Sequence, residues 1–338
     1  LSCWYNTYAI FHLILFIKLY YNFVMFNNKN VLITGGTGSF GKNLTKFLLG
    51  RFKKIKRLVI FSRDELKQYE LRKTLDPNKY SCLRFFLGDV RDKQRLVRAL
   101  DGIDYVFHAA ALKQVDTAEY NPFEFIKTNI VGSQNLIEAS LDSSVKKVLA
   151  LSTDKASSPI NLYGATKLCA DKLFISANNI VGKKNIKFSV LRYGNVMFSR
   201  GSILPLLIER YKQKKSFRIT DTRMTRFNIE LNQAINISNA CMKKMIGGEL
   251  FVPRLKSYKV LDLAKAINEK TKIEIIGIRP GEKLHEEMIS RIDSLNTYND
   301  GKIFIIADPL NEKLNKYYKK FKKMKSYFSY NSYDNNEY

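Results

Sequence analysis

A strand, a glycine-rich loop and a helix follow one another near the start of the chain, and this unit constrains the fold most. The apolar run Val31–Thr34 is typical of a short buried strand, and residues 44–48 have the apolar spacing of a helix. In such units the first glycine permits a tight turn, the second lets the backbone approach a pyrophosphate, and the third lets the helix pack on the strand. Gly35, Gly38 and Gly41 have these three places. We therefore predict an α/β fold with a Rossmann-type, doubly wound parallel sheet.

The adenosine end of the predicted dinucleotide site follows a second strand-like run, Leu58–Phe61. The ribose position there carries Ser62 and Arg63 instead of the acidic residue that is typical of NAD-binding proteins. A hydroxyl and a guanidinium suit a 2′-phosphate, so we predict NADP rather than NAD as the cofactor. The alternative is that Arg63 is a surface residue and that Asp64 binds the ribose. In the glycine loop the predicted contacts are Gly35, Thr37, Gly38, Ser39, Phe40 and Gly41.

Two further strand-like runs, Leu83–Leu87 and Tyr105–Phe107, end where a doubly wound sheet presents its strands to the cofactor. Asp89 is placed to contact the adenine, and the small side chains of Ala109–Ala111 let the backbone lie close to the nicotinamide ribose. We expect His108 to be a hydrogen-bonded structural residue rather than a base. The predicted cofactor contacts in this part of the chain are Asp89, Val90, Ala109, Ala110, Ala111, Lys113 and Asn129.

A candidate catalytic group follows the apolar run 147–151. Tyr163 and Lys167 open a predicted helix and lie on the same face of it. The ammonium of Lys167 is expected to lower the pKa of the Tyr163 hydroxyl and to hydrogen-bond the nicotinamide ribose, so that the phenolate takes a hydroxyl proton as hydride leaves. Such a pair is common by itself, but after a dinucleotide-binding fingerprint it is specific. Asp154 and Lys155 form either an acid–base pair beside the substrate or a surface ion pair.

Residues from about Asn28 to Pro309 carry a family resemblance. The segments that carry it are TGGTGSFG, SRDELKQYE, GDVRD, HAAALKQV, KTNIVGSQN, ALSTDKASSPINLYGATKLCADKLF, LRYGNV, SRGS, TRMTRF, GGELFVP and IRPGEKLHE. With them the chain resembles the inverting UDP-N-acetylglucosamine 4,6-dehydratases, which are extended short-chain dehydrogenases/reductases. The resemblance implies a smaller C-terminal α/β substrate lobe, tightly bound NADP, UDP-N-acetylglucosamine as substrate and a homo-oligomer, either a hexamer or a dimer. It also implies the first step of pseudaminic acid synthesis, which serves surface polysaccharides and flagellin glycosylation.

The resemblance also implies roles for individual residues. Tyr163 assists oxidation at C4 of the sugar, with Thr153 near the C4 oxygen, and the resulting ketone makes the C5 proton acidic. Lys155 then removes that proton, and Asp154 protonates the departing C6 hydroxyl. Hydride returns to C6, and reprotonation of C5 from the opposite face inverts this centre. Simple C4 epimerases share the glycine loop and the Tyr–Lys pair but need no such acid and base, so Asp154 and Lys155 distinguish the two activities.

Several downstream residues are expected at the nucleotide-sugar. Arginine suits a diphosphate because its planar guanidinium binds phosphate oxygens in pairs, although each arginine could instead be a solvated surface charge. Two positions depart from the family pattern, since Phe198 stands where a glycine is usual and Asn228 where an aromatic residue is usual. His285 and Glu286 are expected on the surface of a helix. The predicted substrate contacts are Lys113, Asn195, Arg200, Thr225, Arg226, Arg279 and Glu282.

The chain divides into four predicted parts: an N-terminal extension (1–27), an NADP-binding domain with the catalytic residues (28–190), a part that mainly forms the substrate lobe (191–310), and a basic tail rich in Tyr and Asn (311–338). The apolar stretch 4–26 is interrupted by polar residues and is marginal as a membrane span. We expect residues 1–24 to be translated upstream sequence ahead of Met25 rather than a membrane anchor. The tail segment Tyr330–Tyr333 resembles the closing segment of the family.

The charge and the cysteines exclude several other classes of protein. A net charge of +26 suggests nucleic acid as a partner, but no nucleic-acid-binding motif is present and an anionic nucleotide-sugar also needs positive charge. The cysteines form no CxxC pair and have no histidines at metal-ligand spacing, so we expect neither a metal nor disulfides, and a cytoplasmic location. The competing functions are a retaining dehydratase, a C4 epimerase and a non-catalytic scaffold that binds nucleotide-sugars.

Overall fold

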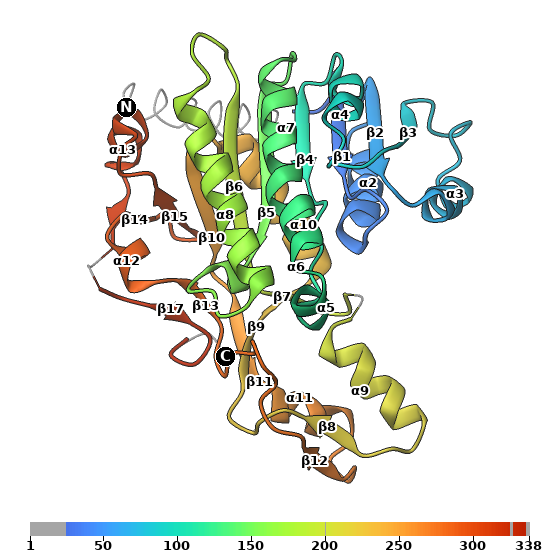
Figure 1. Cartoon of the computed structure of the whole chain (residues 1–338), viewed down its shortest axis with the longest axis vertical. Helices are drawn as coiled ribbons and strands as arrows, with labels where there is room; N and C mark the ends of the chain where they lie inside the picture. The colour runs from blue at the N-terminus through green and yellow to red at the C-terminus, as the bar shows by residue number, and fades with distance from the viewer. Residues whose placement is uncertain (1–24, 200, 325–326, 336–338) are drawn as a thin grey trace, which may run out of the picture.

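The computed structural model describes residues 25–199, 201–324 and 327–335. The predictions on residues 1–24, the predicted substrate contact Arg200 and the last three residues of the tail lie outside these ranges. Within them, a large sheet forms the centre of the molecule and a small lobe projects from one end of it (Figure 1). The predicted Rossmann-type architecture with a smaller lobe is confirmed.

The large sheet has ten strands in the order β16-β14-β15-β10-β6-β5-β4-β1-β2-β3. The strands from β10 to β3 in this order run parallel, and β1 to β6 have the strand order of a Rossmann fold. The central strands are nearly continuous apolar runs because both faces of the sheet are covered. Their bounds are Asn30–Thr34 (β1), Arg57–Ser62 (β2), Leu83–Leu87 (β3), Tyr105–His108 (β4), Lys147–Thr153 (β5), Lys187–Tyr193 (β6) and Glu249–Pro253 (β10).

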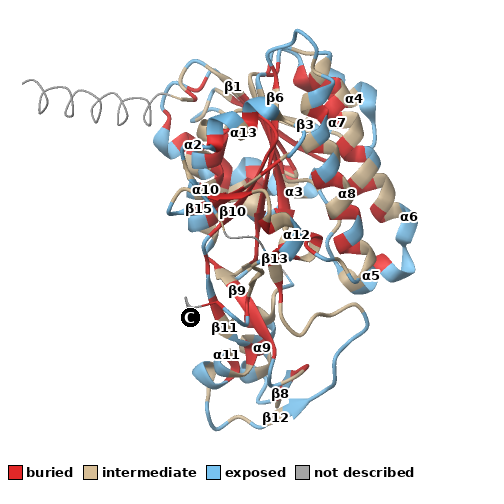
Figure 2. Ribbon diagram, turned by 90° about the vertical axis from the view of Figure 1, so that its left-hand side faces the viewer, coloured by how far each residue is buried: buried red, intermediate tan, exposed pale blue. Residues whose placement is uncertain are grey.

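Helices cover the two faces of this sheet as separate layers, with α4, α7 and α8 on one face and α2 and α10 on the other (Figure 2). Side-chain caps begin several of them; Asp92, for example, accepts the N–H of Arg95 at 2.9 Å at the start of α4. The helices of this part are α2 (Ser39–Arg51), α3 (Glu65–Thr74), α4 (Lys93–Leu100), α5 (Val115–Tyr120), α6 (Pro122–Phe125), the π-helix η1 (Ile126–Val131), α7 (Gly132–Leu141), the 3₁₀ helix η2 (Asp154–Ala156), α8 (Leu162–Ser176), the 3₁₀ helix η3 (Ala177–Asn179) and α10 (Leu231–Lys244).

The chain beyond residue 253 returns to the large sheet. β15 pairs antiparallel with β10, β14 pairs with β15, and β16 forms the edge. The predicted basic tail contributes here, because α13 buries Leu314 and Tyr318 and exposes its lysines. The elements are β13 (Glu287–Ile289), α12 (Arg291–Ser294), β14 (Thr297–Asn299), β15 (Ile303–Ala307), α13 (Glu312–Tyr318), β16 (Lys322–Lys323) and β17 (Tyr330–Asn331).

The small lobe has its own apolar core, which is separate from the core of the sheet. Leu207, Phe217 and Met224 are buried there together with residues of α11. A three-stranded sheet, β11-β9-β7, connects this lobe to the end of β6 (Figure 1). The elements are β7 (Asn195–Val196), α9 (Ile203–Lys212), β8 (Phe217–Ile219), β9 (Thr225–Ile229), β11 (Lys256–Lys259), α11 (Val260–Ile267) and β12 (Ile273–Ile275).

Candidate active site

The nucleotide loop joins β1 to α2. Gly35 has a φ of +64°, and a Cβ atom there would lie 2.8 Å from backbone atoms of Ala109 and Ala110. Both the dihedral angle and this contact exclude a side chain. A Cβ atom on Gly41 would lie 2.5 Å from Cα of Gly36. The loops after β1 and β4 therefore form one narrow backbone cradle at the N-terminus of α2, and its shape fits a pyrophosphate.

The predicted ribose position follows β2. The guanidinium of Arg63 lies there, 3.6 Å from the carboxylate of Asp89, with 46% of the side chain exposed. Asp64, the alternative ribose ligand, caps α3 by accepting the backbone N–H of Lys67 at 2.9 Å. Burial acts to raise the pKa of Asp89, but hydrogen bonds from Arg91 outweigh it, and the pKa lies below its usual range. Arg63 is thus better placed than Asp64 for a 2′-phosphate, and its contact with the cofactor stays a prediction.

Two buried polar residues support the loop after β4. His108 is 1% exposed, its Nδ1 lies 2.8 Å from Oγ1 of Thr34, and burial lowers its pKa to about 3. The prediction of a structural histidine is confirmed. Asn129, in η1, accepts the N–H of Leu112 and donates to the carbonyl of the same residue, both at 2.9 Å. Asn129 therefore shapes the loop that carries the exposed Lys113, while direct contacts of either residue with the cofactor stay predictions.

Helix α8 begins against the segment that follows β5. Asn161 caps this helix by accepting the N–H of Gly164 at 2.7 Å. A Cβ atom on Gly164 would lie 2.3 Å from the carbonyl oxygen of Lys155. Glycine at this position therefore lets α8 contact η2. This contact brings the phenol of Tyr163 close enough to Asp154 and Lys155 for their charges to affect its pKa.

Tyr163 and Lys167 are both buried. Burial raises the pKa of Tyr163 to about 12, and the positive charge of Lys155 and a hydrogen bond with Thr153 oppose this rise. Nζ of Lys167 donates to the carbonyl of Leu151 at 2.8 Å, and burial lowers the Lys167 pKa. The leading cation that acts on the phenol is Lys155. The expectation that Lys167 lowers the Tyr163 pKa stays a prediction.

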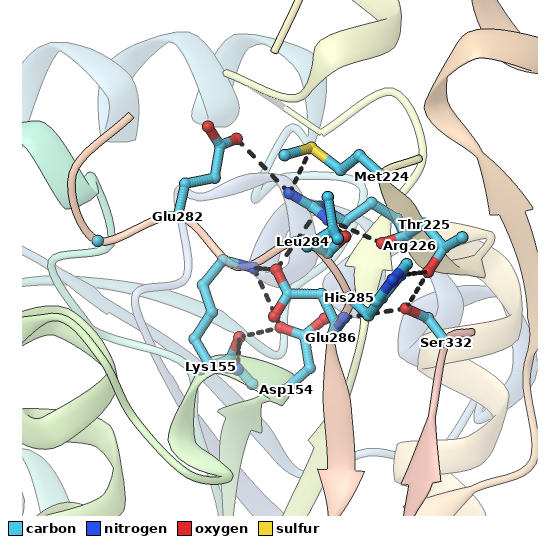
Figure 3. A network of polar contacts seen from close by, with 12 residues as sticks. Asp154, Lys155, Met224, Thr225, Arg226, Glu282, Leu284, His285, Glu286 and Ser332 are labelled. Carbon is cyan, nitrogen blue, oxygen red and sulfur yellow. Dashed lines mark hydrogen bonds and ion pairs between the residues drawn. The ribbon is translucent and has the colours of Figure 1, made fainter. Parts of the chain in front are cut away.

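Asp154 is buried and Lys155 is only partly exposed, so the alternative of a surface ion pair is wrong. The side chain of Asp154 is 1% exposed and that of Lys155 is 24% exposed. Nζ of Lys155 lies 3.1 Å from Oδ1 of Asp154 and 3.0 Å from Oε1 of Glu286, between the two carboxylates (Figure 3). The Thr153 hydroxyl donates to the same oxygen of Asp154 at 2.9 Å. The arrangement places an acid and an amine side by side.

The expectation that His285 and Glu286 lie on a helix surface is also wrong. Glu286 is 1% exposed and directly precedes the strand β13. It is covered because β17 of the tail pairs with β13, and the N–H of Ser332 donates to the Glu286 carbonyl at 2.8 Å. Nδ1 of His285 lies 2.8 Å from Oγ1 of Thr225, and its ring packs on the ring of Tyr333. The tail thus forms one wall of the candidate site.

The charges in this group favour one distribution of protons. Burial raises the pKa of the Asp154 carboxyl. Burial acts to lower the pKa of Lys155, but the charges of Asp154 and Glu286 raise it above its usual range. Burial acts to raise the pKa of Glu286, but Lys155 and Arg226 lower it below its usual range. Burial therefore favours the protonated carboxyl at Asp154, while the neighbouring charges favour the ammonium at Lys155 and the anion at Glu286.

Residues 31–308 match the model of a family described as polysaccharide biosynthesis protein. The chain belongs to this family. It is 54% identical over 284 residues to the inverting UDP-N-acetylglucosamine 4,6-dehydratase of Campylobacter jejuni serotype O:23/36, covering 84% of each chain. It is 44% identical to the UDP-glucose 4-epimerase of Rickettsia bellii, covering 79% of each. The crystal structure of Pen from Bacillus thuringiensis superimposes with a TM-score of 0.84 at 40% identity, over 92% of this chain and 94% of Pen.

One predicted substrate residue of this family member, Asn195, lies toward the small lobe together with the two departures from the family pattern. Asn195 in β7 is the register partner of Asn228 in β9. The Oδ1 atoms of both are buried and have no hydrogen-bond partner among the described residues. Phe198 has a φ of +58°, the left-handed region that favours glycine, and its side chain is exposed. Of the two departures from the family pattern, Asn228 therefore lies in the β7–β9 strand pair and Phe198 lies just after β7.

The other predicted substrate residues lie around the loop before β13. The guanidinium of Arg279 lies 3.1 Å from the carboxylate of Glu282, and much of its side chain is exposed. Arg226 is buried instead, 3.5 Å from Glu282 and 3.6 Å from Glu286. The hydroxyl of Thr225 contacts Ser332 at 2.7 Å. Arg226 and Thr225 therefore belong to the network behind the acid–base pair, and their predicted contacts with substrate stay predictions.

Sequence reasoning missed two members of this site, Glu286 and Ser332. Glu286 lies in the family segment IRPGEKLHE, where the sequence placed it on a helix surface, and Ser332 lies in the tail. Neither has an apolar pattern around it that would indicate burial. Among the described residues, every helix is too short or too polar to cross a bilayer, and no cluster of His, Cys, Asp or Glu could hold a metal ion.

Proposed function

We propose that this chain catalyses the inverting 4,6-dehydration of UDP-N-acetylglucosamine to UDP-2-acetamido-2,6-dideoxy-β-L-arabino-hex-4-ulose. The observation that carries the proposal is the Asp154–Lys155 pair beside Tyr163. Epimerisation at C4 requires only that hydride leaves and returns at one carbon. Dehydration also requires a base for the C5 proton and an acid for the C6 oxygen, and this pair supplies both. The name of the Campylobacter relative supports the same activity.

The nicotinamide cofactor is proposed to bind in the cradle formed by the loops after β1 and β4. When bound, it accepts hydride from C4 of the sugar and returns it to C6, so no net oxidation occurs. Tyr163 takes the proton of the C4 hydroxyl, and the positive charge of Lys155 stabilises the phenolate. Thr153, which hydrogen-bonds Asp154, orients the C4 oxygen. Lys167 holds the nicotinamide ribose from the end of β5, where its amine is bound to Leu151.

The elimination is assigned to Asp154 and Lys155. Because burial raises its pKa, Asp154 keeps a proton that it donates to the departing C6 hydroxyl. Oδ2 of Asp154 is buried without a hydrogen-bond partner among the described residues, and Gly194 next to it brings no side chain. Lys155 first releases its own proton to solvent, and as a neutral amine it then takes the C5 proton that the C4 ketone has made acidic. Reprotonation of C5 from the opposite face then gives the inverted product.

NADP is the proposed form of the cofactor, because Arg63 lies exposed at the ribose position and Asp64 is held as a helix cap. From the family resemblance we propose that the reaction is the first step of pseudaminic acid synthesis for a surface glycan. On the same basis we propose that the chain forms a homo-oligomer and acts in the cytoplasm. The free thiols of Cys82, Cys169 and Cys241 are consistent with a reducing compartment.

A second candidate function is C4 epimerisation of a UDP-sugar, because relatives such as the Rickettsia bellii protein are named UDP-glucose 4-epimerase. The same fold and the same Tyr–Lys pair would serve that reaction. The two functions differ in whether C5 loses its proton and C6 its oxygen. They therefore give products that can be distinguished without any variant.

The deciding experiment is to incubate the purified protein with UDP-N-acetylglucosamine in deuterated water and to record proton NMR spectra of the product. Inverting dehydration gives a 6-methyl signal, deuterium at C5 and the inverted C5 configuration. A retaining dehydratase gives the ketone with the original C5 configuration, and an epimerase gives a C4 epimer that keeps its C5 proton. Binding of the UDP-sugar without turnover would support a non-catalytic scaffold and contradict the proposal.

A further inference from the structure

Lys155 is held by two carboxylates, but only one of them has a role in the reaction proposed above. Oε1 of Glu286 lies 3.0 Å from Nζ of Lys155, and Oδ1 of Asp154 lies 3.1 Å from the same nitrogen (Figure 3). The second oxygen of Glu286, Oε2, is buried and has no hydrogen-bond partner among the described residues. A buried carboxylate that is not fully paired is costly, so this position needs an explanation.

Glu286 is held in place by its backbone as well as by its charge. Its N–H donates to Oγ of Ser332 at 2.9 Å, and its carbonyl accepts the N–H of Ser332 at 2.8 Å. Arg226, from β9, lies 3.6 Å from Oε1. Three segments that are distant in sequence therefore converge to aim this carboxylate at Lys155. Such support is typical of groups whose position matters for chemistry.

The charged and titratable groups around Lys155 and Glu286 come from every neighbouring element. Asp154 belongs to η2, Arg226 to β9, and Glu282 and Lys283 to the loop before β13; the phenols are those of Tyr163 in α8 and Tyr258 in β11. Lys283 donates to the Ser157 carbonyl, so its charge also points into this region. Glu286 lies 3.0 Å from the ammonium of Lys155 and 3.6 Å from the guanidinium of Arg226, so its carboxylate contacts both cations. Its charge therefore affects the protonation of the whole group.

We propose that Glu286 is a positioning residue for the dehydration, which fixes the amine of Lys155 beside Asp154 and sets the pH range in which Lys155 is the base and Asp154 the acid. This inference rests on the proposed function. The negative charge of Glu286 favours the ammonium over the amine at Lys155 and the protonated over the ionised carboxyl at Asp154. Removing that charge therefore lowers both pKa values, and both limbs of the pH–rate profile move to lower pH.

The test is the pH dependence of product formation for Glu286→Gln, which removes the charge but keeps a hydrogen-bond acceptor and nearly the same shape. We expect both limbs of the kcat/KM profile to move to lower pH by about 1 unit or more, the shift typical of removing a neighbouring charge at this distance. KM for the UDP-sugar should change little. Glu286→Asp, which keeps the charge but retracts it, should give a smaller shift in the same direction, and it replaces the glutamine variant if that variant does not fold.

Glu287→Gln is the matched control, because Glu287 is the adjacent glutamate and contacts the hydroxyls of Ser157, Ser158 and Ser329 instead of Lys155. Its profile should superimpose on that of the parent. A Glu286→Gln profile that superimposes on the parent's, or that is lower by one factor at every pH, would overturn the inference and leave Glu286 a merely structural role. The proposed function fails separately, if the parent chain itself forms no 4-keto-6-deoxy product.

Discussion

The nucleotide cradle and the acid–base centre lie at the same end of one sheet but are built in different ways. The cradle depends on the exclusion of side chains: Gly35 contacts Ala109 and Ala110 so closely that no Cβ atom fits. The acid–base centre depends on charged side chains from η2, β9 and the segment before β13, and on the neutral Ser332 of the tail. The cradle joins two loops whose residues are 75 positions apart, whereas Lys155 and Glu286 in the acid–base centre are 131 positions apart.

This difference predicts that the two regions fail differently. In the cradle no other group can replace the close contact between the two backbone loops. A methyl group added to one of its glycines should therefore weaken binding of the dinucleotide. The acid–base centre shares its charge among several groups, so single changes should affect rate and pH dependence while the dinucleotide still binds. The following predictions test that separation, beginning with the largest expected effect.

Asp154→Asn should lower the rate of dehydration by about 10²–10⁴-fold, the usual contribution of a general acid. The amide keeps the size of the side chain but has no acidic proton for the C6 oxygen. Affinity for NADP should stay within about two-fold to three-fold of the parent, because changes at distant sites without shared partners act independently. Product NMR and calorimetric titration with NADP measure the two effects. Dehydration at the parental rate would remove Asp154 from its proposed role.

Gly35→Ala should destabilise the fold by about 1–3 kcal/mol, the usual cost of a residue held in a strained backbone conformation. A Cβ atom at a φ of +64° would also lie 2.8 Å from the loop after β4 and would spread the cradle apart. Thermal unfolding and NADP titration should both show the loss. The matched control is Gly50→Ala in α2, where a Cβ atom would have nothing within 4 Å and helix propensity should improve. Equal behaviour of the two variants would contradict the steric explanation.

The two regions also differ in how far the sequence predicts them. The run Val31–Thr34 and the glycines after it are adjacent in sequence, so the pattern alone indicates strand, turn and helix. Asp154 and Lys155 were identified by their place between strand and helix, but their burial depends on Glu286, which reaches them through the pairing of β13 with β17. Such pairing depends on tertiary contacts, and a short polar strand carries almost no periodic signal.

Arg63→Ala should weaken binding of NADP by about 10-fold or more and leave NAD unaffected, because a charge-assisted hydrogen bond contributes about 1.5–3 kcal/mol. The guanidinium lies at the ribose end of the cradle, 3.6 Å from the carboxylate of Asp89. Isothermal titration with both oxidised cofactors measures the effect. Arg98→Ala, on the exposed face of α4, is the matched control and should bind both cofactors as the parent does. Equal losses for NADP and NAD would show that Arg63 does not contact a 2′-phosphate.

Ser332→Ala should have the smallest effect and should act on the acid–base centre alone. It removes the acceptor for the Glu286 N–H at 2.9 Å and the 2.7 Å contact with Thr225. Losing a hydrogen bond that contributes about 1 kcal/mol makes the active position of Glu286 roughly five-fold less populated. Dehydration should therefore slow by a similar factor. NADP affinity should not change. Ser329→Ala is the control on the same tail, because Ser329 bonds Glu287 instead. If Ser332→Ala weakened NADP binding as much as it slowed dehydration, the cradle and the acid–base centre would be one cooperative unit, and the contrast between them would be lost.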